Sequence, residues 1–428
     1  MTSSNGPTPG AGTLAGLKVV EFAHVIAGPL AGTLLADLGA DVVHVDEPVG
    51  GDPGRKMGPP KDDVYLWWKV SARNKRSVTL DLRSEEGQDV ARQLVRWADV
   101  VITNFRVGTL ERWGLDWEAV HAENPGVIYL QVTGFGARSS LANAPGFGKV
   151  GEARSGVVYV TGFADGPPVH TGFSHADTVT ALMGAYAITA ALHRRATDPE
   201  WDGEWIDLAL FESLYRLIEW QVIFYDQLGT TPERNGNQLA VAPAAVINTY
   251  RTKDDVWLTV TSGTPRSVRN VAALVGVEPE RVATVELQRA NAALLDERLG
   301  AWIAERSADE CLARMVELEV TASQIFSVED IVKDPTYAEL GDVITVEDPE
   351  LGPVRMQGVI PRMTNHPGTV WRTGPTLGQD NRAVYQGFLG MDDDAYDALV
   401  AGGVIAPPAD PAADDPAPTD SPAIATAD

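Results

Sequence analysis

The stretch TGFSHADTVTALMGAYAITAALHRR, residues 171–195, holds a single carboxylate, Asp177, ahead of a long apolar run. A carboxylate at a helix start can be a nucleophile, because the partial positive charge there favours its ionised form and free amides can stabilise developing oxyanions. The spacing of Ser174 and Asp177 equally fits an ordinary helix cap, worth about 0.3–1 kcal/mol. From the local sequence alone capping is the simpler interpretation, although the two roles are compatible.

Thiol and dinucleotide chemistry find less support. Cys311 is the only cysteine, which excludes an intramolecular disulfide, a thiolate zinc cluster and a redox pair. Its helical context, ADECLARMVELEV, predicts a buried structural thiol, and no metal site is predicted. The turn FAHVIAGPLAG lacks the G-x-G-x-x-G of a dinucleotide site, so Asp46 and Glu47 are interpreted as acids that end a strand.

Alternating apolar segments and helical patterns precede Asp177. Alternation of this kind predicts an α/β fold whose mostly parallel, Rossmann-like sheet is covered by helices on both faces. Ser84 is expected to cap the second helix. Strands are expected at 16–23, 40–48, 76–82, 99–105 and 126–136, with helices at 28–39, 84–98 and 111–124.

The predicted pattern of secondary structure changes after two long helices, which are expected around 176–195 and 204–228. A hairpin is predicted at 246–263, several short helices at 266–321, and strands and a closing helix from about 335. The predicted organisation is a disordered tail (1–13), a large domain in two parts (14–228 and 335–406), a smaller α+β domain (229–334) and a disordered acidic Ala/Pro tail (407–428).

The formal net charge of −25 argues against nucleic-acid and anionic-membrane partners, because both surfaces would repel the chain. The N-terminus has neither a basic region nor an apolar core of a signal peptide, and no run of about 18 apolar residues occurs. A soluble, cytoplasmic protein is therefore expected.

Five collinear motifs carry a more specific signal. They are GLKVVEFAHVIAGPLAGTLLADLGADVVHVDEPVGGDPGR, NKRSVTLDL, ADVVITNFRVGTLERWGLDW, NPGVIYLQVTGFG and HADTVTALMGAYAITAALHRR. Their order and spacing resemble the family III CoA-transferases of the CaiB/BaiF type, which include formyl-CoA:oxalate and carnitine CoA-transferases. Weaker signatures, RNGNQLAVAP, VKDPTY and GPTLGQDNRAVYQGFLGM, extend the resemblance over about residues 15–405.

The resemblance implies that Asp177 is the nucleophile. Its carboxylate would attack an acyl-CoA thioester to give a mixed anhydride, and CoA would return to give an aspartyl-CoA thioester. CoA would then pass to an acceptor carboxylic acid. Coenzyme A and acyl-CoA would be substrates, with no permanently bound cofactor. The family fold further implies a homodimer of two interlocked chains.

The resemblance also assigns CoA contacts. Arg83, Arg106 and Arg112 suit phosphate or ribose groups best on chemical grounds. The basic cluster from Arg73 to Ser77 is interpreted either as part of the CoA entrance or as a surface turn. The full set of expected contacts is Val25, Ile26, Ala27, Leu80, Asp81, Leu82, Arg83, Asn104, Phe105, Arg106 and Arg112.

Departures from the family pattern leave alternatives open. Ile26 and Glu47 stand where the formyl-CoA:oxalate enzymes have Gln and Arg, and no glycine run occurs between 230 and 265, which argues against oxalate as acceptor. An acyl-CoA racemase of the same family is one alternative, although residues 143–151 lack the histidine of that acid–base pair and His175 is interpreted as a loop or cap residue. A non-catalytic acyl-CoA-binding protein is the other.

Overall fold

The computed structural model describes residues 10–407 except 240 and 243, so the tails predicted at the two ends lie largely outside the described residues. Residues 10–13, which were expected to belong to the disordered tail, pack on the end of helix α1 (Ala27–Asp37). Gly12 has a φ of +145°, and a Cβ at this position would lie 2.1 Å from the Leu38 carbonyl oxygen. Only glycine fits there.

The chain divides into two compact units, each assembled from separate segments. Among the described residues, unit 1 comprises 10–133, 181–208 and 344–407, and unit 2 comprises 134–180 and 209–343 without 240 and 243. The domain boundaries expected from the sequence, at 228/229 and 334/335, remain predictions.

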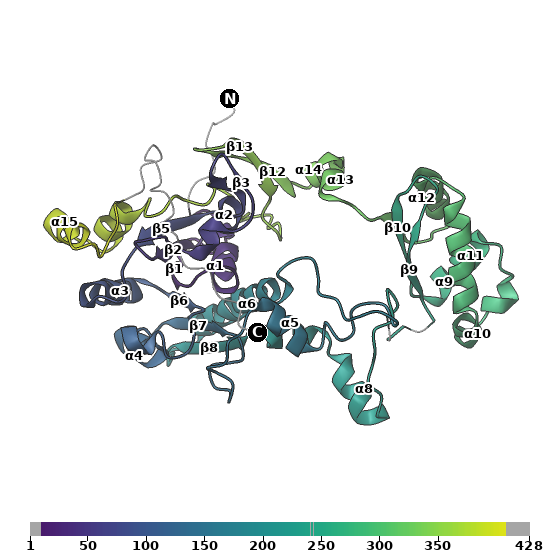
Figure 1. Ribbon diagram of the computed structural model, residues 1–428, viewed down its shortest axis with the longest axis horizontal. Coiled ribbons are helices and arrows are strands. Elements are labelled where there is room, and N and C mark those ends of the chain that lie inside the picture. The colour runs from purple at the N-terminus through teal and green to yellow at the C-terminus, as the bar shows by residue number, and fades with distance from the viewer. Residues whose placement is uncertain (1–9, 240, 243, 408–428) are drawn as a thin grey trace, which may run out of the picture. The chain divides into compact units, whose positions relative to one another are not determined.

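A six-stranded sheet runs through unit 1 in the order β5-β2-β1-β6-β7-β8 (Figure 1). The β5–β2, β2–β1, β1–β6 and β6–β7 pairs are parallel, which confirms the predicted α/β fold with a mostly parallel sheet. The strands are β1 (Lys18–Phe22), β2 (Asp41–Asp46), β5 (Lys75–Thr79), β6 (Val100–Thr103), β7 (Ile128–Thr133) and β8 (Glu204–Ala209).

Strand β1 shows how helices cover both faces of this sheet. Val20 and Phe22 join the buried cluster that also includes residues of α3 (Glu85–Trp97). Glu21 points the other way, onto Gly32 of α1, where a Cβ would lie 1.6 Å from a Glu21 carboxylate oxygen. Period-two alternation therefore places α1 and α3 on opposite faces. Ser84 caps α3 as predicted, accepting from the Gly87 N–H at 3.0 Å.

The C-terminal segment of the chain closes the β5 edge of unit 1. The Thr79 N–H donates to Asn381 Oδ1 (2.8 Å), and Tyr385 donates its hydroxyl to the Thr79 carbonyl (2.9 Å). The other unit 1 elements are α2 (Leu66–Ser71), α4 (Trp117–Glu123), the predicted closing helix α15 (Asp393–Ala401), a π-helical turn (Ala383–Phe388), short β3 (Pro60–Lys61) and β4 (Val64–Tyr65), and β13 (Gly352–Gln357) pairing with β12 (Val343–Asp348).

Unit 2 contains the predicted hairpin, which is confirmed as antiparallel β9 (Val246–Arg251) and β10 (Trp257–Ser262), with β11 (Ala322–Gln324) on the other side of β10. Cys311 is fully buried in its core and burial raises the thiol pKa to about 11, which confirms the structural assignment. The helices are α5 (Gly148–Ser155), α7 (Leu210–Leu217), α8 (Trp220–Leu228), α9 (Pro265–Leu274), α10 (Val285–Ala290), α11 (Ala292–Ala304), α12 (Ala308–Glu317), α13 (Val328–Lys333) and α14 (Pro335–Glu339).

The long helix expected at 204–228 is wrong over its first part. Residues 204–209 form the edge strand β8, and the helical remainder is divided into α7 and α8. A short apolar run such as EWIDLAL fits a strand and a helix equally well, and only its place beside β7 in the sheet decides between them.

Candidate active site

Asp177 is the third residue of helix α6 (His175–Thr197), whose first turn belongs to unit 2. Gly148, the first residue of α5, lies directly against its carboxyl group. A Cβ on Gly148 would lie 1.9 Å from Asp177 Oδ2 and 2.8 Å from Cγ. The missing side chain therefore lets the α5 backbone approach the carboxyl group closely.

A second carboxylate, Glu152 of α5, is buried and fully bonded. It accepts from Lys149 Nζ on both oxygens (3.0 Å each), from His170 Nδ1 (2.6 Å) and from the His175 N–H (3.2 Å). Lys149 also donates to two carbonyls in the segment 171–173, at 2.9 and 3.0 Å. Glu152 thus ties α5 to the first residue of α6, two positions before Asp177.

The pKa values of the two carboxyl groups are shifted in opposite directions. Burial raises the pKa of Asp177 to about 6; a hydrogen bond from its own backbone N–H lowers the pKa in part, and the negative charge of Glu152 raises it by more than Lys149 lowers it. Burial acts on Glu152 in the same sense, but hydrogen bonds from His170 and Lys149 outweigh it and lower its pKa. The neighbouring cations are therefore committed to Glu152, and Asp177 keeps an uncompensated charge.

Two histidines, His170 and His175, lie near Asp177 in the sequence, and the structure gives them different surroundings. His175 is the first residue of α6, and its Nδ1 is buried with no hydrogen-bond partner among the described residues. His170 brings an imidazole into the cluster although the window 143–151 has none, but its Nδ1 is engaged by Glu152.

The expected CoA contacts lie in unit 1, at the carboxyl ends of neighbouring parallel strands. The chain leaves β1 towards β2 on one side, while β6 lies on the other side of β1, so the order of the strands reverses at this point. Crevices at such a switch point are the usual ligand sites of open α/β sheets. Residues 25–27 follow β1 and residues 104–106 follow β6.

Two adjoining cavities of about 200 Å³ each open at these strand ends and share Val45, Asp46, Glu47 and Phe105. Phe105 stands between His24 and Trp113, with ring centroids 4.8 and 5.4 Å away. The other lining residues are Leu80, Asp81, Leu82, Arg83 and Trp113 in one cavity and Ala23, His24, Gly51, Asp52 and Pro53 in the other.

The three arginines expected to bind CoA differ in their surroundings. Arg83 lines the first cavity and pairs with Glu47 and with Asp81 Oδ1 (3.0 Å). Hydrogen bonding to Asp81 and the charges of Glu47 and Asp81 raise the pKa of Arg83. Arg106 is exposed, and Arg112 donates to the Gly108 carbonyl at 2.6 Å; neither lines the two cavities. The structure thus brings Arg83, but not the other two, to a cavity.

The basic run from Arg73 to Ser77 is not a surface turn, because Arg73, Asn74, Lys75 and Ser77 are buried, and its part in a CoA entrance stays a prediction. Lys75 is fully buried and donates to both oxygens of Glu21 (2.9 and 3.0 Å). Arg73 pairs with Asp37, and Arg76 Nε donates to Asp41 Oδ1 at 2.8 Å. Internal acids neutralise these cations as strand β5 enters the sheet, and no signal in the local sequence identifies those partners.

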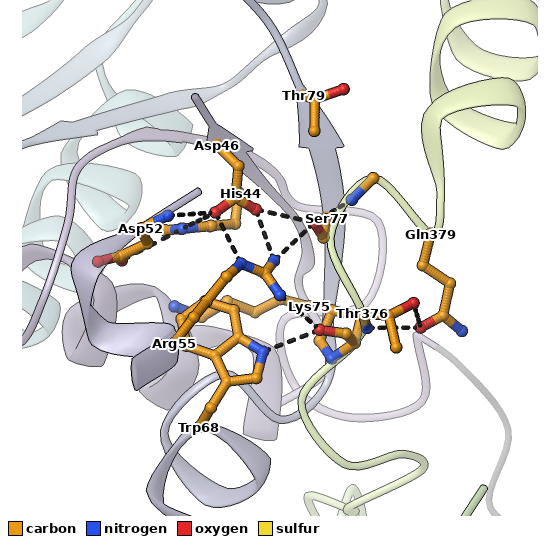
Figure 2. Close-up of polar contacts among 12 residues, drawn as sticks. His44, Asp46, Asp52, Arg55, Trp68, Lys75, Ser77, Thr79, Thr376 and Gln379 are labelled. Atoms are coloured by element: carbon orange, nitrogen blue, oxygen red, sulfur yellow. Dashed lines mark hydrogen bonds and ion pairs between the residues drawn. The ribbon is translucent and has the colours of Figure 1, made fainter. Parts of the chain in front are cut away.

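A buried polar network contributes Asp46 and Asp52 to the lining of the second cavity, and Figure 2 shows its side chains. Arg55 donates to both oxygens of Asp46 (2.6 and 2.9 Å) and to Ser77 Oγ (2.8 Å), and its guanidinium stacks over Trp68 at 4.1 Å. His44 lies between Glu21 (2.9 Å) and Asp52 (3.4 Å). Three carboxylates, those of Glu21, Asp46 and Asp52, thus meet three cationic groups, those of His44, Arg55 and Lys75.

In this network, neighbouring opposite charges outweigh the effect of burial on the pKa values of Asp46 and His44. Burial alone would raise the pKa of Asp46, but Arg55 and His44 lower it to about 2. Burial alone would lower the pKa of His44, but the surrounding carboxylates, Asp46 foremost, raise it to about 9. These groups are charged at neutral pH and are engaged with one another.

Among the described residues, no group of three or more His, Cys, Asp or Glu side chains could hold a metal ion. In the same part of the chain, no helix combines the length and the apolar character needed to cross a membrane.

Comparison with known proteins decides the family. The family model described as CoA-transferase family III matches residues 14–381. The chain belongs to CoA-transferase family III. A succinyl-CoA–D-citramalate CoA-transferase of Chloroflexus aurantiacus is 39% identical over 412 residues, covering 95% of this chain and 100% of that protein.

Two further relatives agree with this assignment. The alpha subunit of a succinyl-CoA–L-malate CoA-transferase, also of Chloroflexus aurantiacus, is 33% identical and covers 89% of this chain and 91% of its own. The crystal structure of a CaiB/BaiF family protein from Brucella suis superposes with a TM-score of 0.77 at 32% identity, covering 88% of this chain and 100% of that one. The protein is therefore an enzyme that transfers CoA.

In each unit of this CoA-transferase, sequence reasoning missed residues close to the expected functional residues. Gly148, Lys149 and Glu152 come from a segment with no helical amphipathicity, so their approach to Asp177 has no local signature. Glu21 and His44 did leave a signal, because each interrupts an otherwise apolar parallel strand that must be buried on both faces.

Proposed function

We propose that Asp177 carries CoA transfer as a covalent nucleophile. The observation that carries the proposal is a carboxylate at the start of a 23-residue helix that pairs with no cation among the described residues and is closely approached by the α5 backbone at Gly148. The positive end of the helix dipole favours the ionised form. A raised pKa, about 6, makes that carboxylate more basic than an ordinary aspartate, while it is still largely ionised at neutral pH.

The reaction proceeds in four balanced steps. An Asp177 oxygen attacks the thioester carbon, CoA thiolate leaves, and a mixed anhydride forms. The thiolate attacks the aspartyl carbonyl, which releases the donor acid and leaves an aspartyl-CoA thioester. The acceptor carboxylate then displaces CoA thiolate to form a second anhydride. The thiolate finally attacks the acceptor's acyl carbon, which restores the Asp177 carboxylate and conserves the thioester energy without ATP.

For binding of CoA we propose the two cavities at the ends of β1, β2, β5 and β6. Phe105 and Trp113 offer aromatic surface for the adenine. The Arg83–Glu47 pair is solvent-exposed, with side chains 63% and 49% accessible, so Arg83 can exchange its partner for a phosphate at little cost. The exposed cations Arg106 and Arg112 complete the expected set of phosphate partners.

The relatives indicate the substrate class. Proteins 33–39% identical to this chain are named for succinyl-CoA as donor and for D-citramalate or L-malate as acceptor, and a succinate–glutarate CoA-transferase of Agrobacterium fabrum is 33% identical. We therefore propose succinyl-CoA as donor and a four- or five-carbon dicarboxylate as acceptor. Mass spectrometry of products from a panel of carboxylic acids identifies the acceptor.

Trapping of the intermediate tests the central proposal. After incubation with succinyl-CoA, hydroxylamine or borohydride should modify Asp177, and Asp177→Ala should abolish transfer while CoA still binds. Asp309, an exposed first-turn acid of α12, gives a matched control, because Asp309→Ala removes only a capping charge. Transfer at the normal rate by Asp177→Ala contradicts the mechanism, and α-deuterium incorporation without an acceptor supports the racemase alternative.

The interlocked homodimer is likewise a proposal, supported by exposed apolar residues of unit 2. Helix α8 has no buried residue, and Val222, Ile223, Tyr225 and Leu228 are each more than half exposed. Patches of this kind on a single chain normally mark an interface. Light scattering should give twice the chain mass, and a monomer contradicts this. A cytoplasmic location remains a prediction.

A further inference from the structure

The turn between β1 and α1 holds a strained residue. Val25 has a φ of +68°, in the left-handed region that β-branched residues rarely adopt. Such a conformation persists only where the surroundings enforce it, and it is typical of sites where geometry serves function. The neighbouring His24 lines the second cavity, so the path of this turn shapes one of its walls.

Asp52 enforces this conformation. The Val25 N–H donates to both carboxylate oxygens of Asp52, at 2.9 and 3.0 Å. On the other side of the turn, Asn104 accepts from the His24 N–H (2.9 Å) and donates to the His24 carbonyl (2.7 Å). The carboxylate of Asp52 is itself fixed by the Gly54 N–H at 2.7 Å. Two acceptors converging on one N–H leave the turn little freedom.

The buried network fixes Asp52 in turn. The Asp52 N–H donates to Asp46 Oδ1 at 2.8 Å, and His44 Nε2 makes an ion pair with the Asp52 carboxylate at 3.4 Å without a hydrogen bond. His44 Nδ1 lies 2.9 Å from Glu21. Glu21 also pairs with Lys75, which donates to the Pro29 carbonyl in the first turn of α1. Glu21 is therefore linked to both ends of the turn, to Val25 through His44 and Asp52, and to α1 through Lys75.

We propose that Asp52 is a positioning residue for CoA transfer, which holds the Val25 turn in the strained conformation that receives the acyl-CoA. The inference rests on the proposed function, because it concerns the same CoA site. Asp52 acts through the backbone of residues 24–27. A charged carboxylate is needed, because an asparagine offers one acceptor oxygen and places an amide where the second acceptor was.

A double-mutant cycle between Asp52 and Val25 tests the proposal. Asp52→Asn should lower kcat/KM for succinyl-CoA by about 10–100-fold, mainly through KM, because a small misplacement of a binding wall has effects of this size. Glycine adopts positive φ without strain, so in a Val25→Gly background the same change should cost less than about threefold. An undiminished effect of Asp52→Asn in that background overturns the proposal.

Asp348 provides the matched control. It is buried and also accepts two backbone N–H groups, those of Glu350 and Leu351 (2.9 Å each), but none from the 23–27 turn. Val25→Gly should rescue Asp52→Asn and should not rescue Asp348→Asn, and equal rescue of both contradicts the proposal. If Asp52→Asn does not fold, Asp52→Glu can replace it in the double-mutant cycle, because it keeps the negative charge beside His44. Absence of CoA transfer by the wild-type enzyme would instead reject the proposed function.

Discussion

Two carboxylates of this enzyme, Asp46 in unit 1 and Asp177 in unit 2, show opposite uses of a low-dielectric site. Asp46 is the more deeply buried, yet Arg55 and His44 hold its pKa at about 2. Asp177 is only partly buried, yet burial raises its pKa to about 6, because Lys149, which is bonded to Glu152, lowers the pKa too little to offset this. Burial thus produces a reactive group only where its charge is left uncompensated.

Replacement of Asp177 by Asn gives the largest expected effect. Transfer should fall by about 10⁴-fold or more, because the covalent route is lost. Since the folded pKa is raised from 3.8 to about 6, the ionised carboxylate lowers stability as pH rises through that window. Asp177→Asn should therefore raise the free energy of unfolding at pH 8 by about 1–3 kcal/mol, with no gain below pH 3.8. Urea denaturation at both pH values checks this.

Asp46→Asn should lower the stability of the protein, in contrast to Asp177→Asn. It leaves the largely enclosed Arg55 guanidinium without its bidentate partner, so the free energy of unfolding should fall by about 3–5 kcal/mol. Glu329→Gln, which breaks an exposed pair with Lys333, is the control and should change nothing measurable. If Asp46→Asn is as stable as wild type, the ion pairs of Asp46 do not stabilise the fold, and the proposed difference between Asp46 and Asp177 is wrong.

Gly148→Ala tests the close approach of the α5 backbone to the Asp177 carboxyl group. A Cβ 1.9 Å from Oδ2 must displace the carboxylate, so kcat should fall by about 10²-fold while CoA binding is retained. Gly172→Ala is a suitable control, because a Cβ there meets no atom within 4 Å. Steady-state kinetics measures catalysis and calorimetry measures CoA binding. An unchanged kcat in Gly148→Ala would show that the close approach of Gly148 to Asp177 does not matter for the reaction.

The network in unit 1 should be sensitive to alkali. The folded pKa of His44, about 9, lies above its ordinary 6.5, so its contribution to stability is complete below pH 6.5 and is lost as pH rises through 9. The loss between pH 7 and 9 should be about 2 kcal/mol. In His44→Gln this part of the pH dependence should disappear, and an unchanged profile would show that other groups are responsible.

The smallest expected effect is on the rate in mild acid. Because the ionised form of Asp177 attacks, kcat/KM for the acyl-CoA should fall about tenfold per pH unit below pH 6. The 3′-phosphate of CoA titrates in the same range. A dephospho-CoA thioester removes that contribution, and a break near pH 4 with this donor contradicts the raised pKa.

Sequence reasoning reached the parts of this molecule that have local causes. The strands around β1, the Ser84 cap and the thiol Cys311 follow from periodicity, capping chemistry and an apolar context. Long-range pairings were out of reach: Lys75 reads as an exposed cation until Glu21, 54 positions away, is placed beside it. The same holds for Gly148 beside Asp177, because the sequence offers no reason for these segments to meet.

The closure of unit 1 by its C-terminal segment has a consequence for synthesis of the chain. Thr79 on β5 and Asn381 are 302 positions apart, so at 5–20 residues per second the partner of this edge strand emerges from the ribosome about 15–60 s later. An unpaired edge strand is a template for aggregation during that interval. The cations Lys75 and Arg76 on β5, which end in ion pairs once the sheet is complete, would keep the nascent edge from pairing with other chains.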